Sequence, residues 1–162
     1  MSRTPSDNSV TPTIRISARR YTFALTLNDE ASSPVGDVVS NPRSAATVAR
    51  AVIGSEITEC VLVIFLDARH RVTGYAEVAR GTINASRLSP RDVLVPSLLA
   101  NAAAIAVVHN HPSGDRSPSR ADRVVTVALR DAAELVGLQL LDHVIVTPTA
   151  HFSFREDEGW GG

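Results

Sequence analysis

The sequence predicts an α/β fold in which helices flank a central mixed β-sheet. Two uninterrupted apolar runs, 60–66 and 103–108, contain several Val and Ile residues, which is typical of strands covered on both faces. Segments with apolar residues at helical spacing lie between these runs and after the second one. Because such strands and helices must bury their apolar faces against one another, we expect a sandwich of helices on a sheet around one core.

The other elements are predicted from their start and stop signals. Two prolines directly follow a residue type that commonly caps the N-terminus of a helix. These pairs are Asn41-Pro42 and Ser89-Pro90. Proline is well suited to the first position of a helix, because its missing N–H would have no partner there. The elements expected besides the two apolar runs are helices beginning at residues 42 and 90, a helix over 120–135, and strands over 72–79, 138–146 and 151–154.

Residues 1–36 and 37–162 are expected to form separate parts of the chain. The first part begins with a stretch rich in Ser, Thr, Pro and Asn, so we expect it to be partly disordered. It also contains two segments, 13–17 and 21–27, in which apolar and polar residues alternate, and this predicts short exposed strands. Pro and Gly residues over 28–40 mark a linker into the second part, which is the main domain.

Composition and charge exclude several classes of function. The formal net charge of -1 creates no overall field toward nucleic acid or anionic lipid. Every basic residue is arginine, which excludes lysine Schiff-base chemistry. The single cysteine, Cys60, excludes an internal disulfide and a cysteine zinc cluster, and its apolar neighbours predict a buried thiol. No apolar run reaches the roughly 18 residues that span a bilayer, and no secretory signal pattern is present. We therefore expect a cytoplasmic protein without a membrane partner.

Three side chains form a pattern that predicts a metal site. His109 and His111 stand two residues apart at the end of a predicted strand, so both imidazoles point to the same face. A turn over 112–115 reverses the chain, and the next helix carries Asp122 in its first turn. Two imidazoles and one carboxylate leave a fourth tetrahedral position for water, which is the ligand arrangement of a catalytic zinc ion.

Each of these residues also has a structural alternative. A histidine beside an apolar strand is commonly held by hydrogen bonds without binding a metal. The pattern Ser119-x-x-Asp122 is a capping box, in which both side chains cap the start of a helix. The combination favours the metal site, because a His-x-His pair on a strand end that faces a helix-starting aspartate rarely arises by chance.

The spacing of these residues resembles a known family motif. His109-x-His111, seven residues, Ser119, two residues and Asp122 is similar to the JAMM motif of the JAB/MPN metalloproteases. The segment His-Asn-His-Pro-Ser-Gly-Asp and the later segment Pro-Ser-Arg-Ala-Asp resemble the corresponding sequence of the RadC branch of that family. The resemblance starts near residue 38 and includes the segments 59–67, 81–84, 141–146, 152–154 and 159–160.

The resemblance implies both a fold and a cofactor. The fold is the MPN/JAB sandwich, which is cytidine-deaminase-like, with a central mixed β-sheet flanked by helices. The cofactor is Zn²⁺, with His109, His111 and Asp122 as its protein ligands. The catalytic-type residues of the motif are all present, which argues against a degenerate, metal-free version of the site.

The resemblance further implies catalytic residues outside the ligand set. The family uses a glutamate from the sheet as general acid/base, and we prefer Glu59, directly before the first apolar run, over Glu77 on the next strand. Ser119 is expected to donate a hydrogen bond to the developing oxyanion, its alternative role being the helix cap. Asp142 and His143 are interpreted as supporting the site or the sheet, with Asp142 as a partner for a ligand imidazole.

The expected function is hydrolysis of an amide bond by a zinc-dependent metallopeptidase or isopeptidase acting on a peptide or protein substrate. Two alternatives stay open. One is a nucleic-acid-associated protein of the DNA-repair type, to which the RadC name is tied, and the other is a binding module that keeps the metal for stability alone. A net charge near zero and an aromatic content of 4% argue against a nucleic-acid surface. The substrate and the oligomeric state are left undetermined by the sequence.

Overall fold

The structure is a computed structural model, which describes residues 13–16, 19–22, 34–81 and 88–160. The chain divides into two units, Met1–Glu30 and Ala31–Gly162. In the first unit, β1 (Thr13–Ile16) and β2 (Arg19–Thr22) pair in antiparallel register. The tail predicted over 1–11, parts of the two predicted strands, and the first residues of the predicted linker lie outside the described residues.

The second unit includes residues on the N-terminal side of the predicted boundary at residue 37. Gly36 donates its backbone N–H to the carbonyl of Val72 at 2.8 Å, and Val72 donates its own N–H to the carbonyl of Asp37 at 2.8 Å. An isolated antiparallel bridge joins Val38 to Arg71. The described residues just before and after position 37 are therefore attached to the same strand.

A five-stranded mixed sheet forms the centre of the second unit. Its strand order is β4-β3-β5-β6-β7, and only the β5–β6 pair is parallel. β3 and β5, the two apolar runs, are buried along their whole length, as the sequence predicts for strands covered on both faces. The strands are β3 (Cys60–Leu66), β4 (Val72–Arg80), β5 (Ala104–Asn110), β6 (Gln139–Val146) and β7 (His151–Ser153).

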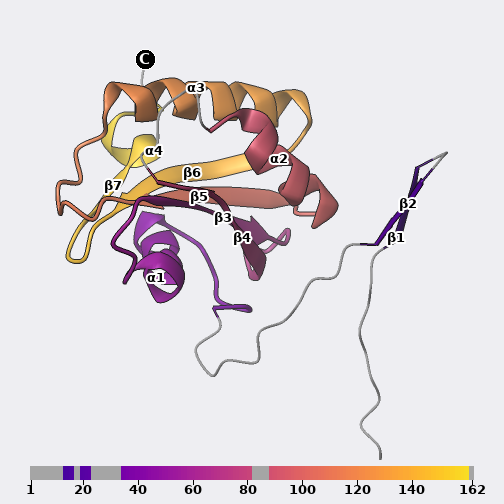
Figure 1. The fold of residues 1–162 in the computed structure, drawn as a ribbon, viewed down its shortest axis with the longest axis horizontal. Helices are drawn as coiled ribbons and strands as arrows, with labels where there is room; N and C mark the ends of the chain where they lie inside the picture. Colours follow the sequence, from indigo (N-terminus) through magenta and orange to yellow (C-terminus); the bar gives the residue numbers. More distant parts are fainter. Residues whose placement is uncertain (1–12, 17–18, 23–33, 82–87, 161–162) are drawn as a thin grey trace, which may run out of the picture. The chain divides into compact units, whose positions relative to one another are not determined.

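Helices cover both faces of this sheet (Figure 1). α1 (Pro42–Ile53) lies on one face, where it contacts β3, β5 and β6. α2 (Pro90–Leu99) and α3 (Arg120–Leu135) lie on the other face and pack against each other. This arrangement of a mixed sheet between helices confirms the predicted fold class. Within the described part of the chain, no helix has the length and apolar character needed to cross a bilayer.

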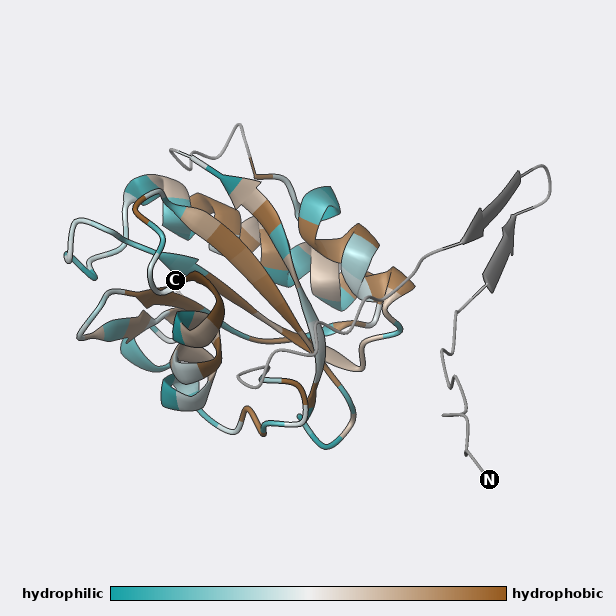
Figure 2. Cartoon of the chain, turned by 60° about the horizontal axis from the view of Figure 1, so that its bottom comes forward, coloured by the Kyte–Doolittle hydropathy of each residue, from teal (hydrophilic) through white to brown (hydrophobic). Residues whose placement is uncertain are grey.

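Alternation along the central strands creates two separate apolar cores, one on each face of the sheet. Along β3, Leu62 and Ile64 belong to the core under α1, whereas Val61 and Val63 belong to the core under α2 and α3. The central strands are accordingly coloured as hydrophobic in Figure 2, and the polar residues gather on the outer faces of the helices and in the loops. The face of β5 toward α3 carries Ile105 and Val107 in the core, and His109 is the next residue on that face.

The helix starts follow the predicted signals. Asn41 accepts the backbone N–H of Ser44 at 2.9 Å, and Pro42 occupies the first helical position of α1. α3 covers the predicted range and ends at Leu135, two residues before Gly137, which has a φ of +71°. The N–H groups of Gly137 and Leu138 then bond to the carbonyls of Glu134 and Ala133, a helix termination that favours glycine because of its left-handed conformation.

One element at the C-terminal end differs from the prediction. The expected strand over 151–154 stops at Ser153, and Phe154 starts the short helix α4 (Phe154–Asp157). Ser153 caps this helix by accepting the backbone N–H of Glu156 at 2.9 Å. The carboxylate of Asp142 on β6 also accepts the N–H of Arg155 at 3.1 Å. These interactions turn the chain out of the sheet, and alternation in Phe-Ser-Phe alone does not reveal them.

Candidate metal centre

The candidate centre lies where β5 ends and α3 begins. His109 is the second-last residue of β5, and His111 comes directly after the strand. A turn closed by the N–H of Gly114 donating to the carbonyl of His111 at 3.1 Å redirects the chain. Gly114 has a φ of +84°, a conformation that glycine adopts without strain. The chain then returns to α3, whose first turn brings Asp122 back to the two histidines.

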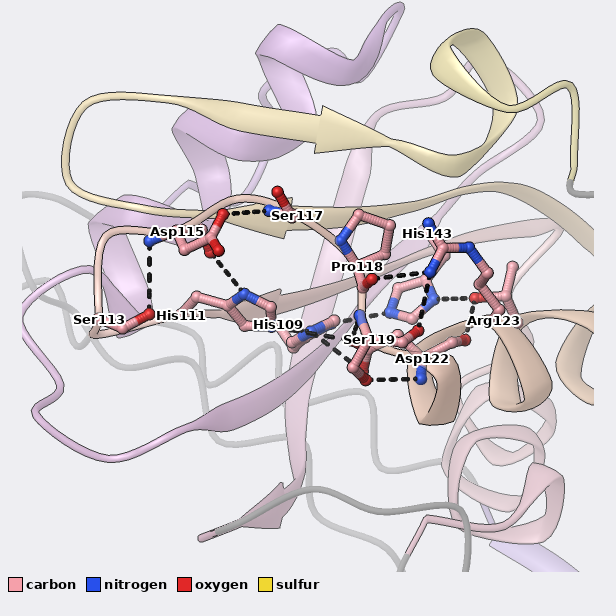
Figure 3. Close-up of polar contacts among 11 residues, drawn as sticks. His109, His111, Ser113, Asp115, Ser117, Pro118, Ser119, Asp122, Arg123 and His143 are labelled. Atoms are coloured by element: carbon pink, nitrogen blue, oxygen red, sulfur yellow. Dashed lines mark hydrogen bonds and ion pairs between the residues drawn. The ribbon is translucent and has the colours of Figure 1, made fainter.

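The three predicted ligands converge in space (Figure 3). Their ligand atoms, which are one imidazole nitrogen from each of His109 and His111 and one carboxylate oxygen from Asp122, lie within 4.8 Å of one another. The two Nε2 atoms are 2.9 Å apart. Nε2 of His109 is 3.5 Å from Oδ1 of Asp122, and Nε2 of His111 is 3.9 Å from Oδ2. Ligands of a tetrahedral zinc ion lie about 3.3 Å apart, so these separations fit such an ion.

The orientation of His111 favours a cation rather than a simple hydrogen bond between the histidines. Its Nδ1 lies 2.7 Å from the carbonyl oxygen of Asp115. Because a carbonyl only accepts, Nδ1 carries a proton, so in the neutral form of the ring the lone pair is on Nε2. This lone pair faces His109 and the carboxylate of Asp122. A positive ion between three electron-rich groups stabilises their close approach. The donor atoms of His109, His111 and Asp122 therefore fit a metal ion.

Burial sets the protonation of the inner histidine. His109 is 1% exposed, and this burial lowers its pKa to about 4, while Asp122 opposes and His111 adds to the decrease. Burial also lowers the pKa of His143, which lies beside His109, well below its ordinary value. Near pH 7 both rings are therefore neutral. A neutral imidazole is the form that binds a metal, so the site needs no proton to be removed from His109.

Asp122 is held in place by the capping box of α3. Its Oδ2 accepts the backbone N–H of Ser119 at 2.7 Å, and Oγ of Ser119 accepts the N–H of Asp122 at 3.1 Å. Asp122 is 4% exposed. The capping alternative and the metal alternative are thus compatible, because Oδ1 faces His109 while Oδ2 also caps the helix. Ser119 keeps its own hydroxyl proton available for donation.

The strand register places Glu77 on the face of the sheet under α1 and relates Glu59 only to the start of β3. Val61 pairs with His109, and Glu59 lies two residues before Val61, directly ahead of the first residue of β3. Glu77 pairs with Leu62, whose side chain lies in the core under α1.

The two candidate bases also differ in their surroundings. Both carboxylate oxygens of Glu77 accept hydrogen bonds from Arg80, from Nε and from Nη2, each at 2.7 Å. The backbone carbonyl of Glu59 accepts the N–H of Gly81 at 2.8 Å, which extends the pairing of β3 with β4 up to this residue. Glu59 is thereby attached to the end of the sheet where His109 and His111 lie.

Asn110, the middle residue of His-Asn-His, attaches the segment before β3 to the end of β5. Its Oδ1 accepts the N–H of Cys60 at 2.6 Å, and its Nδ2 donates to the carbonyls of Glu56 at 3.2 Å and Thr58 at 3.1 Å. Asn110 is buried, and alternation along β5 points it away from the metal face. Its hydrogen bonds hold the segment that carries Glu59 beside the two histidines.

Two further residues lie near the proposed ligands: His143, which was expected to support the site or the sheet, and Thr126, which the sequence analysis missed. His143 contacts His109 with 3.0 Å between its Nε2 and Nδ1 of His109, and Thr126 contacts the other nitrogen of His143 at 2.6 Å. Asp142 was expected to support an imidazole, but its oxygens instead bond to Ser153 at 2.6 Å and to Arg155. Neighbours on a strand face opposite sides, which is why His143 and not Asp142 reaches His109. Thr126 was detectable as the residue one helical turn after Asp122.

A cavity of about 370 Å³ adjoins the outer ligand, His111. Apolar and proline side chains form much of its wall, including Ile57, Pro112 and Pro148. Ile57 is 91% exposed, which is unusual for a large aliphatic side chain. Of the three proposed ligands only His111 borders the cavity, whose wall also includes Arg50 of α1 and Val146 from the core under α1. Cys60, by contrast, is fully buried, as its apolar neighbours predict.

Comparison with known proteins identifies the family. The family model described as the RadC-like JAB domain matches residues 39–160. The chain is 45% identical over 126 residues to a UPF0758 protein of Chromobacterium violaceum, a match that covers 78% of this chain and 56% of that protein. It is 37% identical over 164 residues to a UPF0758 protein of Xylella fastidiosa, covering 99% of this chain and 73% of that protein. The chain therefore belongs to the RadC-like JAB domain family, whose MPN fold matches the mixed sheet between helices described above.

Proposed function

We propose that this protein is a zinc-dependent metallopeptidase or isopeptidase that hydrolyses an amide bond. The observation that carries the proposal is the convergence of His109, His111 and Asp122, whose ligand atoms lie within 4.8 Å of one another. Membership in the JAB domain family supports a hydrolase. Two imidazoles and one carboxylate are a ligand set that zinc uses in catalytic sites, where the fourth position stays open.

The protein side chains would act around that open position. When bound, zinc lowers the pKa of a water molecule to about 7 and polarises a substrate carbonyl. In the proposed mechanism, Glu59 accepts a proton from the attacking water and later passes it to the leaving amine. Its position two residues before Val61, the strand partner of His109, supports this role. Glu77 is disfavoured because Arg80 binds both of its carboxylate oxygens.

Ser119 would stabilise the negative charge that develops on the carbonyl oxygen. Its Oγ accepts the N–H of Asp122, so the hydroxyl proton remains for a donor role. The residue is exposed at the start of α3, beside the buried carboxylate of Asp122. A donor held in place by the helix cap needs little rearrangement during the reaction, which is the condition for effective charge stabilisation.

A polypeptide substrate is supported by the surroundings of the outer proposed ligand, His111. The cavity next to His111 has an apolar wall that includes Ile57 and Pro112, and such a wall suits an apolar side chain of an extended peptide. The near-neutral charge of the chain offers no comparable support for a nucleic-acid substrate.

The experiment that tests this function compares Glu59→Gln with Glu77→Gln on a panel of peptide and isopeptide substrates. Glutamine keeps the size of glutamate but cannot accept the proton, so Glu59→Gln should lower kcat by about 10²–10⁴. Zinc content, measured by metal analysis, should stay unchanged. Glu77→Gln removes only an exposed ion pair with Arg80 and should change kcat by a few fold at most.

The control variant also decides between the two bases. If Glu77→Gln is inactive and Glu59→Gln is active, the assignment of the base is wrong. If the wild-type protein binds zinc but cleaves none of the substrates, the hydrolase proposal is contradicted in favour of a binding module that keeps its metal for stability.

A further inference from the structure

A chain of buried hydrogen bonds starts at the inner ligand and ends at another ligand residue. Nδ1 of His109 lies 3.0 Å from Nε2 of His143, and Nδ1 of His143 lies 2.6 Å from Oγ1 of Thr126. Oγ1 of Thr126 lies 2.7 Å from the main-chain carbonyl of Asp122. His143 is 2% exposed and Thr126 is 1% exposed. The four residues thus form a continuous chain closed off from solvent.

The last contact of this chain determines the direction of all the others. A carbonyl oxygen only accepts hydrogen bonds, so the single hydroxyl proton of Thr126 is donated to the carbonyl of Asp122. Oγ1 of Thr126 must therefore accept at its other contact. The donor there is Nδ1–H of His143.

The tautomers of both histidines follow from this direction. In the form of His143 with a single ring proton, the proton on Nδ1 leaves the lone pair on Nε2. That lone pair accepts from Nδ1–H of His109. A neutral His109 with its proton on Nδ1 then presents the lone pair of Nε2 to His111 and Asp122, in the same way as His111 does through its contact with Asp115.

We propose that His143 and Thr126 are positioning residues that hold His109 in the one tautomer able to bind a metal through Nε2. The part of the inference that concerns metal affinity rests on the proposed zinc site, whereas the tautomer itself belongs to the protein chain. The partner of the non-ligating nitrogen sets which nitrogen of an imidazole is free.

Packing supports this role by holding the ring of His143 in one plane. The ring stacks on Phe154, with 5.0 Å between the ring centroids and an angle of 15° between the planes. Phe154 is itself fully buried at the start of α4. Because Asp122 provides both the carboxylate near His109 and the carbonyl that ends the chain, a shift of α3 would disturb two ligands together.

The direct test measures histidine tautomers in the metal-free protein by long-range ¹H–¹⁵N correlation NMR. We expect His109 and His143 to carry their protons on Nδ1 in the wild type. Thr126→Val keeps the shape of the side chain but removes the hydroxyl. The rings of His109 and His143 should then no longer be held in the tautomer with the proton on Nδ1. Thr126→Ser restores a hydroxyl and should restore the wild-type spectrum. The inference is overturned if His109 carries its proton on Nε2 in the wild type, or if the Val and Ser variants give the same tautomers.

A second readout measures zinc affinity by competition with a chelator, at a temperature where each variant is folded. Loss of a partner of this kind weakens metal binding by about 10–100-fold, which we expect for Thr126→Val and His143→Leu. His143→Gln offers a carbonyl oxygen that accepts from His109, so it should bind zinc more tightly than the leucine variant. Equal affinity of the Val and Ser variants would contradict the positioning role. If the wild type shows the expected tautomers but binds no zinc, the metal proposal fails while the tautomer assignment stands.

Discussion

Two residues at the start of α3, Ser119 and Asp122, combine an observed capping role with a proposed chemical role. Ser119 and Asp122 cap the helix through a reciprocal pair of hydrogen bonds, and the same capping bond holds the Asp122 carboxylate beside the two histidines. A short local pattern in the sequence therefore determines the position of one ligand with little help from distant residues. A substitution at either position affects folding as well as chemistry, so its effects must be separated by experiment.

Ser119 offers such a separation at the scale of a single residue. Ser119→Ala should cost about 1 kcal/mol in the free energy of unfolding, because the N–H of Asp122 loses its cap. If Ser119 also donates to the oxyanion, kcat should fall by about 10²–10³, while zinc content stays unchanged because the backbone N–H of Ser119 still holds Asp122. Chemical denaturation, metal analysis and steady-state kinetics on one preparation measure the three effects.

Ser119→Asp is the matched control for this prediction. Aspartate caps helices well but donates no hydrogen bond when ionised. The variant should be as stable as the wild type to within about 1 kcal/mol, should bind zinc, and should be nearly inactive. A folded Ser119→Asp protein with normal turnover would reduce Ser119 to a helix cap.

At the scale of elements, α4 is attached to β6 by one buried carboxylate. Asp142 is 5% exposed and accepts hydrogen bonds from the hydroxyl of Ser153 and the N–H of Arg155. Burial raises its pKa to about 6 in spite of these hydrogen bonds, which act in the opposite direction. An acid whose pKa is higher in the folded state destabilises the fold once it must ionise there.

The pH dependence of stability should reveal this cost. Between pH 4 and pH 6 the folded protein keeps a proton on Asp142 that the unfolded chain has already lost, so the free energy of unfolding falls as the pH rises. The full loss, about 3 kcal/mol from a difference of roughly two pKa units, is present above pH 6. Asp142→Asn removes this titration. The free energy of unfolding of Asp142→Asn, minus that of the wild type, should therefore increase by up to about 3 kcal/mol between pH 4 and pH 8.

An exposed carboxylate provides the control for Asp142. Asp131 lies on the outer surface of α3, where it pairs with Arg130 at 3.2 Å. Asp131→Asn should shift the stability curve by less than about 1 kcal/mol at every pH. A stability difference between Asp142→Asn and the wild type that stays constant from pH 4 to pH 8 would contradict the account of Asp142.

Local signals explain which elements were predictable from the sequence. The range of α3 was predicted correctly because Ser119 caps its start and Gly137 ends it. The buried strands β3 and β5 were predicted correctly because an uninterrupted apolar run has few alternatives. The prediction of a strand up to residue 154 was wrong at its last residue, where α4 begins. The start of α4 depends on Asp142, a residue more than ten positions earlier in the chain. The place of His143 in the centre likewise depends on the pairing of β5 with β6, which no local pattern specifies.

At the scale of the whole second unit, the candidate centre joins the central sheet to the helical layer. His109 belongs to β5, whereas Asp122 belongs to α3, and both are buried. A metal held by residues from both layers binds only the folded protein, so it adds its binding free energy to the stability of the fold.

Zinc should therefore raise the melting temperature of the protein. At a free zinc concentration 100 times the Kd, the added stability is about 2.7 kcal/mol, which corresponds to a rise of several degrees for a domain of this size. A chelator should reverse the rise. The His109→Ala, His111→Ala double variant should show no response to zinc in differential scanning calorimetry. A zinc-dependent rise that persists in this variant would place the stabilising metal elsewhere.

The most direct test of the central claim is the zinc content of the purified protein, measured by elemental analysis after zinc loading and removal of loosely bound metal. We expect one zinc ion per chain in the wild type and none in the His109→Ala, His111→Ala double variant, because the two imidazoles provide two of the three protein ligands. Wild-type protein without zinc after loading, or a double variant that keeps one zinc ion per chain, would contradict the proposed site.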